Sequence, residues 1–226
     1  MRVRAIIQAR MGSSRLRGKS LSSINGIPLL KRVIDTIISL ELTDDIVVVT
    51  TTQIEDDPLE AYCKFLNIKC LRGDVNDVLS RFSDASIDLD MRDTLIRITA
   101  DNIFYQKNIC KELLTIHSHM GNDYTGIKGL SHIVCELIKV AAIRIVLNRQ
   151  LNDYDKEHVT PYFINNPDMF KSTLCDPFEF GLEKSLDGLL TVDTAEDRDR
   201  IEQLITHFEM ENRTFTKENL YNWLQL

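Results

Sequence analysis

Long apolar runs and paired cysteines are both missing from this sequence of 226 residues. No run approaches the roughly 20 apolar residues that a membrane-spanning helix requires, and the apolar stretch after the first two arginines is too short for a secretory signal. The five cysteines are odd in number and form no C-x-x-C pair, which argues against a disulfide framework or a zinc site. We therefore predict a cytoplasmic protein with reduced thiols and no membrane-spanning part.

Positive charge is also scarce, since 27 Lys and Arg residues stand against 34 Asp and Glu residues and give a net charge of -7. Proteins that bind nucleic acid or a membrane surface usually carry a basic stripe, and here basic residues cluster only near the N-terminus. Glycine and proline nowhere gather into a linker, and no segment repeats. With 43% hydrophobic residues, the chain is long enough for one sizeable core, so we predict a single domain over residues 1–226.

Apolar periodicity predicts a fold in which strands and helices alternate. The expected strands cover residues 4–8, 46–50, 68–71, 95–99 and 189–193, and the expected helices cover residues 28–38, 58–66, 75–87, 107–119 and 194–208. Repeated β-α-β units with short connections give an α/β fold with a mostly parallel central sheet flanked by helices. Residues 123–140 form the least regular section, and we predict an irregular middle insertion there. The wider segment 120–165 is the expected flap or dimerisation element and the expected sugar-binding segment.

A cationic loop follows the first predicted strand and reads Ala9-Arg10-Met11-Gly12-Ser13-Ser14-Arg15-Leu16-Arg17-Gly18-Lys19. Glycines let backbone N–H groups approach an anion, and Arg and Lys neutralise its charge, so the loop predicts a polyphosphate-binding site. A Walker A loop fits less well, because five residues rather than four separate Gly12 from Gly18 and because arginines are foreign to that motif. A surface loop with solvated charges is the remaining alternative.

This loop and four later segments together resemble the cytidylyltransferases that activate acidic sugars, especially the spore coat polysaccharide biosynthesis protein F branch. The later segments are Arg72-Gly73-Asp74, Asp77-Val78-Leu79-Ser80-Arg81-Phe82, Glu157-His158-Val159-Thr160-Pro161-Tyr162 and Leu190-Thr191-Val192-Asp193-Thr194-Ala195-Glu196-Asp197. The resemblance implies a Rossmann-like nucleotidyltransferase fold. It also implies transfer of CMP from CTP to an acidic sugar with release of pyrophosphate, in the synthesis of a surface polysaccharide or glycan.

The resemblance also implies which residues hold the nucleotide. Arg10, Arg15 and Lys19 take the catalytic roles, because fixed cations stabilise the charge of a phosphoryl-transfer transition state. Arg81 contacts the cytosine ring or a phosphate, unless it is a helix-surface cation. Thr51 lies at a strand end where it reads base edges, unless it is an ordinary β-branched strand residue. The full expected nucleotide-binding set is Ala9, Arg10, Gly12, Ser13, Ser14, Arg15, Lys19, Thr51 and Arg81.

Asp101 and Asp193 follow predicted strands and resemble the family's metal aspartates, so Mg²⁺ is the expected cofactor. Asp193 is alternatively a helix cap or turn residue. Around Asp101 the family usually has Gly-Asp followed by a Pro one or two residues on, whereas this chain has Ala100-Asp101-Asn102-Ile103. We expect the alanine to crowd the nucleotide and the missing proline to free the loop, and a structural Asp101 is the alternative. A shared metal cluster requires the two carboxylates to lie within about 6 Å of each other.

The sugar site is the least defined part of the prediction. Glu157 and His158 are assigned structural or sugar-contact roles rather than base catalysis. The stretch from Lys128 to Glu136 takes the place of a family segment that carries aspartates, and Gly129 and Glu136 are its expected sugar contacts. CTP and an acidic sugar are the expected partners, in a homodimer. Two alternatives stay open: a nucleotide-binding module that has lost its chemistry, and a transferase with another nucleotide or acceptor.

Overall fold

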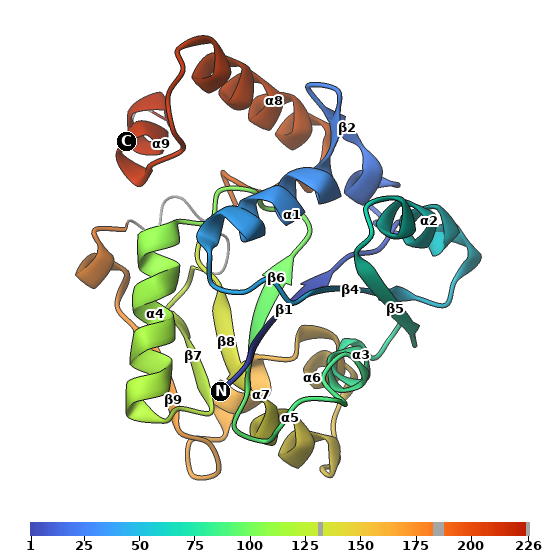
Figure 1. Cartoon of the computed structure of the whole chain (residues 1–226), viewed down its shortest axis with the longest axis vertical. Coiled ribbons are helices and arrows are strands. Elements are labelled where there is room, and N and C mark those ends of the chain that lie inside the picture. Colours follow the sequence, from blue (N-terminus) through green and yellow to red (C-terminus); the bar gives the residue numbers. More distant parts are fainter. Residues whose placement is uncertain (131–132, 183–187, 225–226) are drawn as a thin grey trace.

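The computed structural model describes residues 1–130, 133–182 and 188–224. A seven-stranded sheet runs through the molecule in the order β5-β4-β1-β6-β8-β7-β9 (Figure 1). Four strands form a parallel half; β8 is antiparallel to both β6 and β7, and β7 is parallel to β9. The mostly parallel sheet confirms the predicted fold class. Its strands are β1 (Val3–Gln8), β4 (Ile46–Thr51), β5 (Lys69–Gly73), β6 (Thr94–Thr99), β7 (Tyr124–Ile127), β8 (Glu136–Lys139) and β9 (Ser172–Cys175), and a separate hairpin pairs β2 (Ser23–Ile24) with β3 (Ile27–Pro28).

Helices cover both faces of this sheet (Figure 1). The α-helices are α1 (Leu29–Leu40), α2 (Asp57–Phe65), α3 (Val78–Asp84), α4 (Lys107–Met120), α5 (Val140–Leu147), α6 (Asp153–His158), α7 (Pro161–Asn165), α8 (Ala195–Met210) and α9 (Lys217–Leu224). Short 3-10 helices are η1 (Lys19–Leu21), η2 (Ile54–Asp56) and η3 (Pro177–Phe180). Among the described residues, no helix is both long and apolar enough to cross a bilayer.

Two hydrophobic cores result, one on each face, because side chains alternate along a strand. In β1, Ala5 and Ile7 pack with α1, α2, α4 and α8, whereas Ile6 packs with α3 and α5. Every residue of β4 is buried, as expected of a strand that helices cover on both sides. The apolar runs in the sequence therefore predicted the strands of the parallel half correctly.

Local capping determines where several helices begin. The Thr194 side chain accepts a hydrogen bond from the Asp197 amide, and the Asp197 carboxylate accepts one from the Thr194 amide, which makes a capping box at the start of α8. Asp77 accepts a hydrogen bond from the Ser80 amide, so α3 begins at Val78 rather than at residue 75. Pro28 caps α1 from the end of β3 instead of opening the helix.

Two sections differ from the expected elements. The strand expected over residues 189–193 is wrong, because there only Thr191 forms a bridge, to Asn102. The middle section holds two four-residue strands, β7 and β8, which join the central sheet. The sequence did not predict these strands, since Gly126 and Gly129 interrupt their apolar pattern. Ser131 and His132, between them, lie outside the described residues.

Candidate active site

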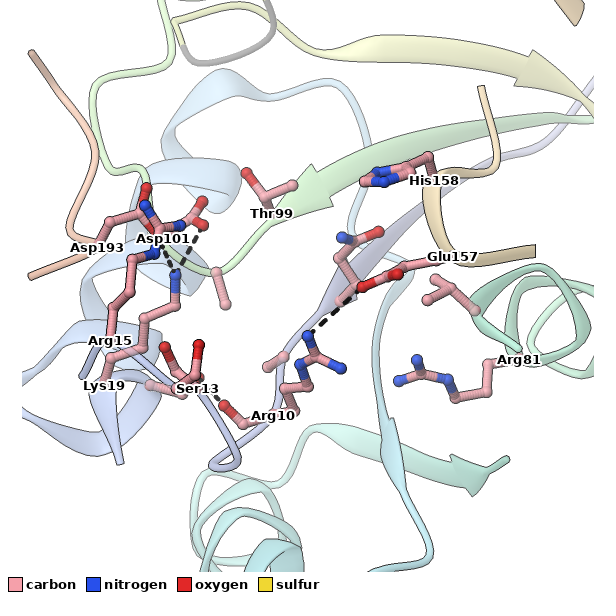
Figure 2. A pocket seen from close by; sticks show the side chains of 16 residues that line it. Arg10, Ser13, Arg15, Lys19, Arg81, Thr99, Asp101, Glu157, His158 and Asp193 are labelled. Carbon is pink, nitrogen blue, oxygen red and sulfur yellow. Dashed lines mark hydrogen bonds and ion pairs between the residues drawn. The ribbon is translucent and has the colours of Figure 1, made fainter. Parts of the chain in front are cut away.

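A cavity of about 260 Å³ lies where β1 and β6 end, side by side in the sheet. From this pair the chain order of the strands runs outward in opposite directions, and ligands of open α/β sheets bind at such a switch point. Side chains from the cationic loop, from the segments after β6 and before α8, and from α3 and α6 converge there (Figure 2). The predicted site residues that line it are Ala9, Arg10, Ser13, Ser14, Arg15, Lys19, Arg81, Asp101, Glu157, His158 and Asp193.

The cationic loop is folded back on itself by its own backbone. The carbonyl oxygen of Met11 accepts hydrogen bonds from the amides of Ser13 and Gly18, and the Ser20 hydroxyl donates to the Arg10 carbonyl. Gly18 has φ 73°, a left-handed conformation that glycine adopts without steric cost. This turn directs Lys19 and Arg15 toward the segment before α8 (Figure 2).

Asp56 anchors the loop, although no motif in the sequence predicts this role. The Asp56 carboxylate accepts hydrogen bonds from the Met11 amide at 2.7 Å, the Thr50 hydroxyl at 2.8 Å, and both the amide and the hydroxyl of Thr51. Burial alone would raise the pKa of Asp56, but the hydrogen bonds from Thr51, Met11 and Thr50 outweigh it and lower the pKa. A buried carboxylate thus ties the end of β4 to the first turn of the cationic loop.

We call Lys19, Asp101 and Asp193 the lysine–aspartate cluster. The Lys19 ammonium donates to Asp101 Oδ2 at 3.0 Å and to Asp193 Oδ1 at 2.9 Å, and Arg15 reaches the same Asp193 oxygen at 3.0 Å. The two carboxylate oxygens are therefore no further apart than the sum of the two lysine contacts, which meets the criterion for a shared metal. Burial opposes the charge on Lys19, but Asp101 and Asp193 outweigh it and raise its pKa.

Backbone contacts bring the two aspartates together. The Val192 amide donates to the Asp101 carbonyl at 2.9 Å, and the Asn102–Thr191 bridge fixes the same pair of segments. Asn102 is fully buried, and its side-chain oxygen accepts a hydrogen bond from the Phe104 amide. The bond from Val192 to Asp101 and the contact of the Asn102 side chain with Phe104 hold this segment without the family's proline.

The other end of the cavity is strongly cationic. Arg10 lies 3.6 Å from a Glu157 oxygen, and Arg81 points toward Arg10 (Figure 2). Arg81 is buried, and its Nε has no hydrogen-bond partner among the described residues. Burial first, and then the charge of Arg10, lower the pKa of Arg81. Gly73 makes room for this arginine, since a Cβ at that position would stand 2.6 Å from Arg81 Cγ.

A strained turn holds Glu157 and His158 at this end. Val159 has φ 65° and ψ -59°, and the Thr160 amide donates to the His158 carbonyl at 2.7 Å, which together make a γ-turn of the rare, strained kind. A β-branched residue pays for this conformation with about 1–3 kcal/mol. Its fully buried side chain keeps the turn in place. Such strain tends to occur where a side chain must be held for function.

Four predicted residues lie outside the first cavity. Gly12 and Thr51 line a second cavity, of about 620 Å³, on the other side of the cationic loop. Gly129 has φ 72° in the exposed turn after β7. Glu136 is buried, and its carboxylate is bound by Arg97 and by the Tyr124 hydroxyl. Both oxygens of Glu136 are thus committed within the protein.

The donor set around Lys19 fits a hard divalent cation. Within the described ranges, no group of three or more His, Cys, Asp or Glu side chains is arranged to hold a metal. Mg²⁺ needs only one or two carboxylates when substrate phosphates and water complete its shell. Asp101 and Asp193 converge on one point, where the Val192 carbonyl also lies 3.3 Å from the lysine nitrogen.

Comparisons with known proteins show what this chain is similar to. The sequence pattern of the family described as Cytidylyltransferase matches residues 4–221. The spore coat polysaccharide biosynthesis protein SpsF of Bacillus subtilis is 33% identical over 206 residues, which cover 88% of this chain and 84% of that protein. A cytidylyltransferase of Leptospira borgpetersenii superimposes with a TM-score of 0.81 at 23% identity, over 92% of this chain and 88% of that one. CMP:2-keto-3-deoxy-manno-octonic acid synthetase, solved with CTP, has a TM-score of 0.65 at 12% identity, over 92% of this chain and 99% of the other.

Proposed function

The chain belongs to the cytidylyltransferase family, and on that premise we propose that it transfers CMP from CTP to an acidic sugar of the ulosonic or nonulosonic acid type and releases pyrophosphate. The product would serve the synthesis of a surface polysaccharide or glycan. The observation that carries this proposal is the cavity at the ends of β1 and β6, where a cationic loop faces two convergent aspartates.

The polar groups of the cavity suit a nucleotide triphosphate. Arg10, Arg15, Lys19 and Arg81 line it, and fixed cations in a partly enclosed site stabilise phosphate charge without reorganisation. Two buried atoms beside it also have no partner among the described residues: Gln8 Oε1 and Arg81 Nε. Buried polar groups are rarely left unsatisfied, so these atoms support a polar ligand.

The two ends of the cavity have different tasks in this proposal. Arg15 and Lys19, next to Asp101 and Asp193, would bind the triphosphate. Arg81 would contact the cytosine ring or a phosphate from the opposite end, and Arg10, beside it, would reach the triphosphate. Thr51 and the second cavity, beyond the cationic loop, would lie next to the base.

The sugar hydroxyl oxygen would attack the α-phosphorus of CTP. As that bond forms, the bond from the α-phosphorus to the bridging oxygen breaks, pyrophosphate takes the electron pair, and the hydroxyl proton is released. Asp101 and Asp193 would hold a divalent cation, for which we propose Mg²⁺, and this ion would neutralise charge on the phosphates. Arg10, Arg15 and Lys19 would stabilise the charge that develops on the leaving pyrophosphate.

The acceptor side rests on fewer contacts. Glu157 and His158 line the cavity away from the lysine–aspartate cluster (Figure 2), so we assign them to the sugar. Gly129 stays a proposed sugar contact in the turn after β7. Glu136 supports such a role less well, since Arg97 and Tyr124 already bind its carboxylate.

We also propose that segment 120–165 forms a homodimer interface next to the sugar site. Met120, Ile145 and Tyr154 are exposed apolar residues of this segment, at 46%, 39% and 57%. The substitution Ile145→Lys should shift the mass measured by light scattering toward the monomer. Ile54→Lys, at an exposed residue outside the segment, is the matched control.

Purified protein incubated with CTP, Mg²⁺ and a panel of ulosonic acids tests the main proposal, with pyrophosphate release as the readout. A thermal-shift comparison of CTP, UTP, ATP and GTP identifies the nucleotide, because a ligand that binds the folded state raises its apparent stability. Arg15→Met should weaken CTP binding, whereas Arg92→Met, at an exposed residue that lines neither cavity, should not. No turnover with any keto-acid sugar, together with no stabilisation by CTP, would refute the proposal.

A further inference from the structure

The Lys19 ammonium has three oxygen acceptors: Asp101 Oδ2 at 3.0 Å, Asp193 Oδ1 at 2.9 Å and the Val192 carbonyl at 3.3 Å. An ammonium group carries three N–H donors, so the protein itself saturates this one. All three acceptors are hard oxygens, and two of them are carboxylates. This is the kind of donor set that a divalent cation takes.

We propose that Lys19 occupies the position of the divalent cation while no nucleotide is bound, so that the metal binds tightly only after a triphosphate has drawn the ammonium away. This inference rests on the proposed function, because it concerns the same two aspartates. It adds an order of events: CTP and the metal bind cooperatively, and the lysine links them.

The two cations compete for one set of oxygens. Mg²⁺ requires oxygens at about 2.0–2.1 Å in near-octahedral geometry, and a lysine nitrogen within 3.0 Å of both carboxylates leaves no room for that shell. The ammonium also neutralises charge that would otherwise attract the metal. A metal that binds first must therefore displace Lys19 without offering it a new partner.

A triphosphate offers that partner. Lys19 begins η1 directly after the loop that we assign to phosphate, and its four-carbon stem lets the ammonium move while the backbone stays fixed. Arg15, whose side chain is 65% exposed, binds the same Asp193 oxygen and can follow. Phosphate oxygens would accept hydrogen bonds from Lys19 and Arg15. The carboxylates of Asp101 and Asp193 would then face the metal.

Mn²⁺ binding, followed by electron paramagnetic resonance and calorimetry, tests this inference without turnover. Wild-type protein should bind Mn²⁺ at least ten times more tightly when a non-hydrolysable CTP analogue is present. Lys19→Met, which keeps the length and removes the charge, should bind Mn²⁺ at least ten times more tightly than wild type when no nucleotide is present. Its gain from the analogue should shrink correspondingly, since coupling between two ligands is reciprocal.

Two matched variants separate displacement from a general charge effect. Lys19→Arg keeps a cation beside the carboxylates and should leave nucleotide-free Mn²⁺ binding weak. Arg92→Met removes one exposed charge from a residue that lines neither cavity and should behave as wild type. Equal Mn²⁺ affinities of wild type and Lys19→Met, or an equal gain in Arg92→Met, would overturn the inference.

A failure of the proposed function has a different signature. If wild-type protein with the analogue binds no Mn²⁺, and Asp101→Asn and Asp193→Asn change nothing, the aspartates are not a metal site. If those variants abolish Mn²⁺ binding but Lys19→Met binds it no better than wild type, the metal site stands and the competition by lysine is wrong. Circular dichroism spectra that match wild type should accompany each variant.

Discussion

Strand β6 and the residues just after it contribute to two ion-pair clusters of similar chemistry, one buried and one open to a cavity. Arg97, within the strand, binds Glu136 of β8, and the Tyr124 hydroxyl donates to the same carboxylate at 2.6 Å. We call these three residues the closed cluster. Asp101, just beyond the end of the strand, belongs to the lysine–aspartate cluster.

Burial separates the two clusters. The Arg97 and Glu136 side chains are 11% and 8% exposed, whereas Asp101 and Asp193 are 24% and 25% exposed and line a cavity. Burial and the nearby Glu136 raise the pKa of Tyr124 well above its usual value, so that hydroxyl stays a donor. A carboxylate–cation contact becomes a candidate site only where an outside ligand can reach and replace one partner.

Breaking the closed cluster should have the largest effect on stability. Glu136→Leu or Arg97→Met alone leaves a buried group without its partner, so each should lower the free energy of unfolding by about 3–5 kcal/mol. The double variant should recover part of that loss, because two apolar residues replace a largely buried pair and only the Tyr124 hydroxyl loses its Glu136 acceptor. Urea unfolding measures all three.

Asp35→Asn is the control, since the exposed Lys31–Asp35 pair should contribute less than about 1 kcal/mol. The hypothesis of a sugar contact at Glu136 predicts something else: the double variant would stay folded and lose affinity for the acceptor. Single variants that cost less than about 1 kcal/mol would contradict the description of this cluster as closed.

The same contrast explains what the sequence could predict. The strands of the parallel half could be predicted because buried β-branched runs such as Ile46–Thr51 indicate a strand even when its neighbours in the sheet are unknown. The proximity of Asp101 and Asp193 could be predicted because chain segments converge at one edge of such a sheet, even though Asp193 follows no strand. The closed cluster depends on the antiparallel register between β6 and β8, and a four-residue strand carries too little periodicity to reveal it. Asp56 was missed because its contact with the cationic loop, through the Met11 amide, spans 45 positions of the chain.

Breaking the lysine–aspartate cluster should change activity far more than stability. Asp101→Asn should lower the rate of pyrophosphate release about 100- to 1,000-fold, the usual cost of losing a group that stabilises transition-state charge. The free energy of unfolding should change by less than about 1 kcal/mol, because the pair is partly solvated. Asp35→Asn again serves as the control. A loss of stability as large as that of Glu136→Leu would place Asp101 with the structural pairs.

The buried His117 of α4 should make the free energy of unfolding depend on pH. It is 2% exposed, its Nδ1 lies 3.0 Å from Thr125 Oγ1, and burial first, then Lys139, lower its pKa to about 4 against an opposing effect of Asp123. The unfolded chain, with a histidine pKa near 6.5, therefore binds the proton first as the pH falls. The stability present above about pH 6.5 should decrease by about 3 kcal/mol by pH 4.

Urea midpoints measured between pH 7 and pH 4 check this prediction. His117→Gln should flatten the dependence in that range. His119→Gln, two residues further along on the exposed face of α4, should leave it unchanged. An unaltered slope in His117→Gln would show that other groups govern the acid response.

The smallest expected effect concerns the cap that supports the lysine–aspartate cluster. Thr194→Ala removes the acceptor of the Asp197 amide and should cost about 1 kcal/mol in urea unfolding, whereas Thr194→Ser should cost little. Asp197 Oδ2 still accepts the Asp193 amide at 3.1 Å, so the variant should keep its rate of pyrophosphate release within about threefold of wild type. A tenfold loss of rate at unchanged stability would instead mean that the cap positions Asp193. The geometry of the lysine–aspartate cluster would then depend on its surrounding structure as much as that of the closed cluster does.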